Sequence, residues 1–314
     1  EVQETVKSNA QDLIKICLET NNIQLLVEIC FYSIRNQELG EYGNITFSRL
    51  NSYRETLDYL HQVNTKYVKK IQLLLTHGSV LRHYCFSQNK ISWMEYWPLM
   101  QDALCFYYRA LQAATQINHS MHMLNSIAYS FRFMLNSFKF VHSHDIYSDE
   151  YYFFVGDMVG RFLKKFIHFN DNFDVKKLND EEKKIYMSIC YQAPLVLPLY
   201  IINNNTIPIE FQNFQAAFSD KFKRLNQAYK DNFKSMKKKD FFDEIQPAIQ
   251  LMVFLKKERS DIFNNHLNII QDHLFFVKTH MKIIDKKRNR FGKKYKRSNM
   301  DKTIERFHKL IEDA

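Results

Sequence analysis

The sequence predicts an all-α protein, and three observations support this fold class. The chain has only 6 glycines and 5 prolines in 314 residues, although tight turns and bulges depend on these two residue types. Aromatic residues make up 15% of the chain, which favours bulky packing between helices over disorder or a coiled coil. Apolar residues also return every three or four positions, which is the period of a helix face. We therefore expect antiparallel helical hairpins.

The expected helices follow from this period and from the few residues that break it. Two helices fill residues 1–35, with a break near Asn21 and Asn22, and a loop at 36–46 contains Gly40 and Gly43. A long helix then starts at Thr46, and the pattern leaves open whether it breaks near Asn64 or continues beyond Tyr67. The later helices are expected at residues 98–117, 121–140, 150–170, 181–193, after Pro208, at 247–284 and at 300–311.

Individual residues indicate where these helices begin and end. Pro98 suits the first turn of a helix, where its missing N–H is not needed. Ser148 is followed by two acidic residues and suits a helix N-terminus. Pro194 and Pro198 are expected to end the helix at 181–193, and residues 142–145 are expected to form a loop.

The domain organisation follows from the polar segment at residues 171–180, which is the best candidate for a boundary. We expect a helical domain at 1–170 and a helical-hairpin domain at 171–284. Residues 285–314 are expected to form a basic tail with a short helix.

Several functional classes are disfavoured by what the sequence lacks. It contains no phosphate-binding glycine loop, no strand-turn-helix nucleophile motif and no His-Glu-x-x-His pair, so we expect no enzyme, no cofactor and no small-molecule substrate. His142, His144 and Asp145 are read as a polar turn, and we expect no metal site. No apolar run is long enough for a bilayer, so no membrane is expected as a partner. The five cysteines lie singly on apolar helix faces and are expected to be buried free thiols in a reducing compartment.

Two basic stretches account for the net charge of +10. Residues 221–239 contain eight basic residues and one acidic, and residues 282–297 contain nine basic and one acidic. Aromatic residues lie among them, a combination that suits a phosphate backbone with stacked bases. A solvated helix face and a nuclear import signal are the ordinary alternatives. The candidate nucleic-acid-binding residues are Lys221, Lys223, Arg224, Lys237, Lys238, Lys286, Lys287, Arg288, Arg290, Lys293, Lys294, Lys296 and Arg297.

Three motifs resemble one protein family. The segment from His77 to Tyr84 reads HGSVLRHY and is similar to the helix of 14-3-3-like domains in which an arginine and an aromatic residue hold a phosphoserine. The words YYRAL from Tyr107 and LNSIA from Leu124 resemble consecutive helices of one branch of that fold. A third similarity is RFLKKFIHF, which begins at Arg161. The branch contains the ever-shorter-telomeres telomerase subunit and the nonsense-mediated-decay adaptors.

The resemblance implies a 14-3-3-like bundle that continues into tetratricopeptide-like hairpins and binds partners without catalysis. It places Arg82 at the phosphate-binding arginine position, with Tyr84 beside it and with Arg35 and Arg109 as further cations of one concave face. A guanidinium suits this role because its planar fork holds phosphate through two hydrogen bonds. The chain departs from the family at Ser79, where an aspartate is usual, and at His83, where a tyrosine is usual; in place of the second lysine, Arg35 lies one turn away.

The first functional hypothesis is therefore a non-catalytic adaptor in a ribonucleoprotein assembly, either telomerase-associated or in mRNA decay. Its partners would be RNA or a phosphorylated protein, and its location would be the nucleus, the cytoplasm or both. The basic surplus and the missing second cation favour the RNA-linked role. The alternatives are an unrelated basic helical protein that binds nucleic acid and a helical-repeat scaffold that binds only proteins.

Overall fold

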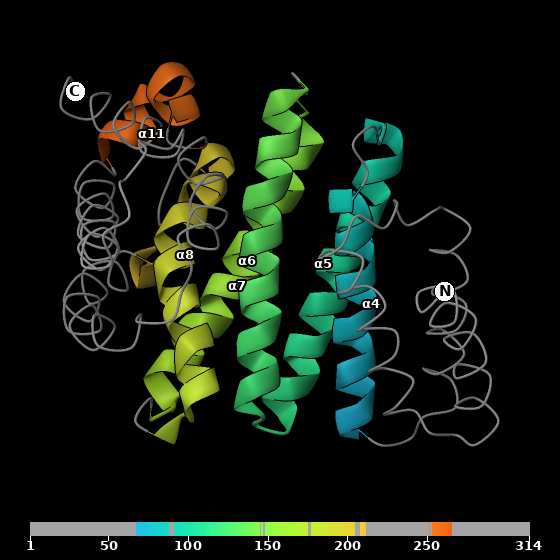
Figure 1. The fold of residues 1–314 in the computed structure, drawn as a ribbon. Coiled ribbons are helices and arrows are strands. Elements are labelled where there is room, and N and C mark those ends of the chain that lie inside the picture. The colour runs from blue at the N-terminus through green and yellow to red at the C-terminus, as the bar shows by residue number, and fades with distance from the viewer. Residues whose placement is uncertain are drawn as a thin grey trace, which may run out of the picture. The chain divides into compact units, whose positions relative to one another are not determined.

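A computed structural model describes residues 67–87, 91–144, 146, 148–174, 177–204, 208–211, 251 and 253–265. These residues are almost entirely helical and include no strand, which confirms the all-α prediction (Figure 1). The helices are α4 (Tyr67–Ser87), α5 (Trp93–Gln116), α6 (Ser120–Ser143), α7 (Asp149–Asn172), α8 (Asp180–Asn204) and α11 (Ser260–Asn265). None of these helices is both long and apolar enough to cross a bilayer.

The described residues belong to two compact units. The first unit contains those up to Ser130 together with Leu178–Ile185, and the second contains Phe131–Lys177 and those from Tyr186 onward. Helices α6 and α8 each contribute residues to both units. The expected domain boundaries at residues 170/171 and 284/285 stay predictions.

In the first unit, α4 and α5 form an antiparallel hairpin. The hydroxyl of Tyr84, near the end of α4, donates a hydrogen bond to Glu95 at the start of α5, with 2.5 Å between the oxygens. Earlier in α4, His77 stacks on Phe106, which lies further along α5, with 3.9 Å between the ring centroids. Residues later in α4 therefore contact residues earlier in α5, so the two helices run in opposite directions. This pair is a helical hairpin of the kind that the predicted fold class contains.

In the second unit, α6 and α7 also run antiparallel. Phe131 meets the ring of Phe162 edge to face at 6.5 Å, and further along α6 the Ser137 hydroxyl lies 2.9 Å from that of Tyr151 at the start of α7. Ser148 caps α7, because its hydroxyl accepts a hydrogen bond from the Tyr151 backbone N–H at 3.4 Å. The expected helix start at Ser148 is confirmed.

Helix α7 packs on α8 through an aromatic contact of Phe166. Phe162, Phe166 and Phe169 of α7 are all buried. Phe166 lies 5.7 Å from the ring of Tyr186, whose hydroxyl also donates a hydrogen bond to Asn170 at 2.7 Å. The three phenylalanines lie on one face of α7, because residues three or four positions apart point to the same side of a helix.

The helix expected at residues 181–193 does not end at residue 193, so that prediction is wrong. Helix α8 continues through Pro194 and Pro198 to Asn204. An interior proline costs a helix about 3 kcal/mol because it removes a hydrogen bond and crowds the preceding turn. Burial of an aliphatic side chain contributes about 1.5–3 kcal/mol. Four such side chains are buried here, so tertiary packing offsets the proline cost: Leu195, Val196, Leu197 and Leu199.

The expected position of Pro98 in the first helical turn is also wrong. Helix α5 begins at Trp93, five residues earlier, and Pro98 lies inside it. Ser92 is the cap, and its hydroxyl accepts a hydrogen bond from the Glu95 backbone N–H at 3.3 Å. The carbonyl that loses its partner to Pro98 belongs to Met94, which is 86% exposed, so water can reach it. His142 and Ser143, expected in a loop, form the last turn of α6.

Candidate functional site

Gly78 allows α4 and α5 to approach closely beside the candidate site. A Cβ atom at this position would lie 2.8 Å from Cε1 of Tyr107 and 3.1 Å from the backbone oxygen of Ala103. No larger residue fits without displacing one of these groups. The close approach also brings the Ser79 hydroxyl within 3.2 Å of the Tyr107 hydroxyl. Tyr107 is fully buried.

Arg82 projects from α4 into this packed region and is only 7% exposed. Its guanidinium carbon lies 4.9 Å from the centroid of the Tyr129 ring on α6, a cation–π distance. Its Nη2 lies 3.3 Å from Nε2 of His83. Its Nε is buried and has no hydrogen-bond partner in the part of the chain that the structure describes. No acidic residue of that part forms an ion pair with it.

The phenol of Tyr107 does not supply the missing negative charge. Burial raises the pKa of Tyr107, while the nearby charge of Arg82 and the hydrogen bond with Ser79 act in the opposite direction. Burial is the largest of these effects, so the hydroxyl stays protonated at neutral pH. Arg82 is therefore a buried cation that no described carboxylate or phenolate neutralises. Such a group can accept an anion, whose oxygen would satisfy Nε.

A ligand can reach Arg82 only if some of the surrounding side chains move. The guanidinium is covered on one face by Tyr129, and 7% of the residue contacts solvent. Association that requires a rearrangement is slower than the roughly 10⁵–10⁷ M⁻¹s⁻¹ that is typical of preformed protein surfaces. Slow binding is thus a property that the geometry predicts for this site.

Tyr84, the aromatic partner expected beside Arg82, is engaged with α5. It is 4% exposed, and its hydroxyl donates to the carboxylate of Glu95. Burial and then the Glu95 hydrogen bond raise the pKa of Tyr84 well above its usual range. Since Glu95 lies in the capped first turn of α5, the Tyr84 contact fastens the end of one helix to the start of the next.

Arg109 lies in a different environment from Arg82. It is exposed, and its guanidinium carbon is 5.8 Å from the centroid of Phe106 on the same helix. The contacts of Arg82 and Arg109 thus involve different aromatic rings. Arg35 lies outside the described residues, and so do both basic stretches with all the lysines and arginines proposed there.

Two residues beside Arg82 were not expected from the sequence. Tyr129 supplies the ring under the guanidinium, and His83 accepts its hydrogen bond. No local pattern singles out Tyr129, because its contact with Arg82 depends on how α4 and α6 are packed. His83 attracts notice in the sequence only as a departure from the family pattern.

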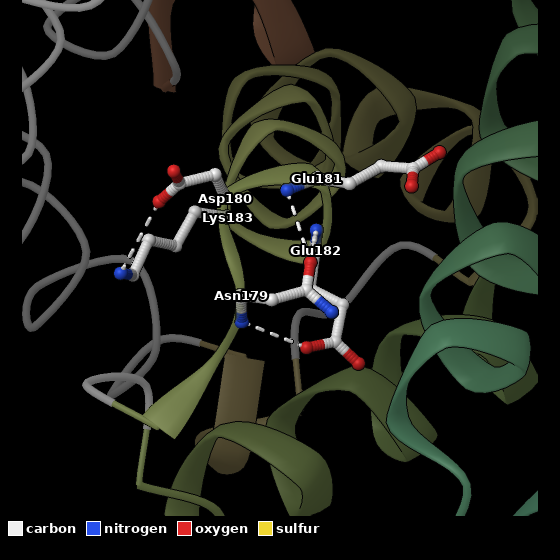
Figure 2. A network of polar contacts seen from close by, with 5 residues as sticks. All are labelled: Asn179, Asp180, Glu181, Glu182 and Lys183. Atoms are coloured by element: carbon white, nitrogen blue, oxygen red, sulfur yellow. Dashed lines mark hydrogen bonds and ion pairs between the residues drawn. The ribbon is translucent and has the colours of Figure 1, made fainter.

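A second polar cluster lies at the start of α8 (Figure 2), and Glu182 connects it to Ser120 at the start of α6. Glu182 is 8% exposed, and its carboxylate accepts hydrogen bonds from the Asn179 backbone N–H at 2.9 Å and from the Ser120 hydroxyl. In return, the Asn179 side chain accepts from the backbone N–H groups of Glu181 and Glu182 at 3.0 and 2.9 Å. This reciprocal arrangement is a capping box, and it satisfies the buried carboxylate.

The two described cysteines differ in their exposure. Cys85 is a buried free thiol whose pKa is raised by burial, whereas Cys105 is exposed, contrary to the expectation that the cysteines are buried. Cys105 lies on the outer side of α5, which the sequence pattern did not distinguish from the inner side. Among the residues placed by the structure, no three His, Cys, Asp or Glu side chains gather as metal ligands do.

No protein-family model matches the sequence, and no curated protein matches it either. The similarity to the ever-shorter-telomeres and decay-adaptor family therefore rests on the three motifs alone. Membership of that family stays a prediction, to be tested through the chemistry of Arg82.

Proposed function

We propose that this chain is a non-catalytic helical adaptor of a ribonucleoprotein assembly, in which Arg82 receives a phosphate group of an RNA or of a phosphorylated protein. The observation that carries the proposal is a buried guanidinium without a carboxylate partner among the described residues. Burial of an unpaired charge costs several kcal/mol, and a bound anion reduces that cost. A guanidinium held on an aromatic ring is also already oriented for phosphate.

The resemblance in sequence gives the proposal its biological setting. The motif around Gly78 and Arg82 resembles the phosphate-binding helix of the 14-3-3-like branch, and the helical hairpins are compatible with that fold. The basic stretches at residues 221–239 and 282–297 favour an assembly that contains RNA. Telomerase association and mRNA decay are the two settings that the family offers.

The test is a binding titration of the full chain with a labelled RNA and with a phosphoserine peptide. Arg82→Met keeps the aliphatic stem and removes the charge. Because charge-assisted hydrogen bonds contribute about 1.5–3 kcal/mol, we expect the affinity for the bound probe to fall about 10- to 150-fold. Arg132→Met is the matched control, since Arg132 is an exposed arginine on α6. Equal affinities of wild type and Arg82→Met for both probes would contradict the proposal.

A second candidate function is nucleic-acid binding by the basic stretches without any role for Arg82. The observation that favours it is their combined surplus of positive charge. In that case deletion of residues 285–314 would remove most RNA affinity and would flatten its dependence on salt, because fewer phosphates are neutralised. Arg82→Met would leave binding unchanged. The adaptor proposal predicts instead that Arg82→Met weakens binding.

A further inference from the structure

The hydrogen bond between Arg82 and His83 indicates whether His83 is charged, and hence the net charge of the side chains at the candidate site. An arginine side chain only donates hydrogen bonds, so Nε2 of His83, 3.3 Å from Nη2, must be the acceptor. A ring nitrogen that accepts carries no proton, and the His83 ring is then neutral. Tyr107 and Ser79, the hydroxyl groups nearby, are neutral as well. The described side chains at the site therefore carry one positive charge.

A single buried positive charge suits a singly charged anion. A phosphodiester carries one negative charge, whereas a phosphorylated side chain carries about 1.5–2 negative charges at neutral pH. The extra charge would be buried without compensation, and this is costly in a medium of low dielectric constant. A solvent-exposed site would tolerate the mismatch, but Arg82 is only 7% exposed.

We propose that the Arg82 site takes the phosphodiester of a nucleic-acid backbone in preference to the phosphate of a phosphorylated side chain. This inference rests on the proposed function, since it specifies the class of ligand at the same site. The role of Arg82 is then to hold one backbone phosphate.

Three probes test this on the full chain. The first is an RNA oligonucleotide with hydroxyl groups at both ends, so that all its phosphates are diesters. The other two are one peptide with a phosphoserine and the same peptide with that phosphate capped as a methyl diester. At pH 7.5, Arg82→Met should weaken binding of the RNA and of the capped peptide about tenfold or more, as expected for one charged hydrogen-bonding group. The phosphoserine peptide should lose less than about threefold, because it gains little from a single buried cation.

A second pH separates ligand charge from protein charge. Phosphoserine takes up its second proton near pH 6, so its Arg82-dependent affinity should rise between pH 7.5 and pH 5.5 while that of the capped peptide stays constant. An equal rise for both peptides would assign the effect to a protein group such as His83 and overturn the charge-matching inference. A phosphoserine peptide that binds through Arg82 more tightly than the capped peptide at pH 7.5 would overturn it too, yet leave the proposed function intact. If Arg82→Met changes none of the three affinities, the proposed function itself fails.

Discussion

Glu182 and Arg82 are two buried charges in the same unit, and their surroundings differ. Glu182 is 8% exposed, and its carboxylate accepts hydrogen bonds from Asn179 and Ser120 at the starts of two helices. Arg82 is 7% exposed, and it has one hydrogen bond, one aromatic ring and an Nε without a described partner. The Glu182 carboxylate has hydrogen-bond donors within the protein, whereas the Nε of Arg82 has no described acceptor and would gain one from a bound anion.

We infer from this difference that Glu182 has a structural role, and the proposed function gives Arg82 a binding role. A carboxylate at a helix N-terminus is stabilised by the free N–H groups and by the helix dipole. A guanidinium enclosed without an anion adds little to stability, and its replacement by an apolar side chain of similar length can be neutral or favourable. Loss of Glu182 should thus reduce stability and spare binding, whereas loss of Arg82 should do the opposite.

Glu182→Ala should produce the largest loss of stability. The substitution removes the return bond of the capping box and leaves the Ser120 hydroxyl and the Asn179 N–H without their acceptor. We expect the free energy of unfolding to fall by about 2 kcal/mol, measured by urea denaturation. Glu181→Ala is the matched control, because Glu181 is an exposed neighbour whose backbone N–H keeps its bond to Asn179. Similar losses for both variants would refute the structural role assigned to Glu182.

Gly78→Ala should have a smaller effect and tests whether the packing beside Arg82 is rigid. The new methyl group would meet the Tyr107 ring at 2.8 Å and a backbone oxygen at 3.1 Å, and a backbone atom cannot easily move. Overpacking costs about 1–3 kcal/mol, and the better helix propensity of alanine returns about 1 kcal/mol, so we expect a net loss of about 1 kcal/mol.

Gly160→Ala serves as the comparison in the second unit. Its methyl group would meet only the ring of Tyr200, at 2.8 Å, and a half-buried side chain can shift. Its unfolding free energy should therefore fall less than that of Gly78→Ala in the same urea titration. A Gly78→Ala protein as stable as wild type would show that the α4–α5 contact can relax.

A pH-dependent effect is expected from His122, a third buried polar side chain. It is 8% exposed, its ring stacks on His119 at 4.1 Å, and neither ring nitrogen has a hydrogen-bond partner in the described structure. Burial, and then the charge of His119, lower the pKa of His122 from 6.5 to about 4. The unfolded chain therefore binds more protons than the folded chain between these pH values, and stability falls as the pH is lowered through that window.

His122→Leu isolates this contribution. We expect the variant to lose less stability than the wild type when urea titrations at pH 7 and pH 5 are compared, because leucine has no proton to bind. The difference between the two proteins should be on the order of 2 kcal/mol, since pH 5 lies past the middle of the window between 6.5 and about 4. If both proteins respond identically to pH, His122 does not contribute to acid sensitivity.

The helices could be predicted from the sequence because their signals are local. The apolar period located α5, α6 and α7 to within a few residues, and Ser148 with its acidic neighbours marked the start of α7. The start of α5 was predicted five residues too late, because Pro98 was assigned to the first helical turn. The pair Ser92 and Glu95, three residues apart, is the N-terminal signal that was overlooked.

The surroundings of the candidate site could not be predicted, because they depend on packing between helices. The sequence marked Arg82 only through a resemblance, and nothing in it indicated that Tyr129 lies under the guanidinium or that Tyr84 is held by Glu95. The continuation of α8 through two prolines has the same origin, since buried leucines outweigh a local helix breaker. Periodicity predicts which face is buried, but not which partner it meets.

The most direct test of the central claim is the stabilisation that RNA gives to the wild type and to Arg82→Met in urea denaturation. At an RNA concentration of about 100 times the dissociation constant, binding should raise the free energy of unfolding of the wild type by about 2.7 kcal/mol. For Arg82→Met at the same RNA concentration, we predict a gain of half that size or less, with a stability without RNA that stays within about 1 kcal/mol of the wild type. An equal gain in both proteins, or a variant that unfolds far more easily without RNA, would contradict the account, because Arg82 would then belong to the structure and not to the binding site.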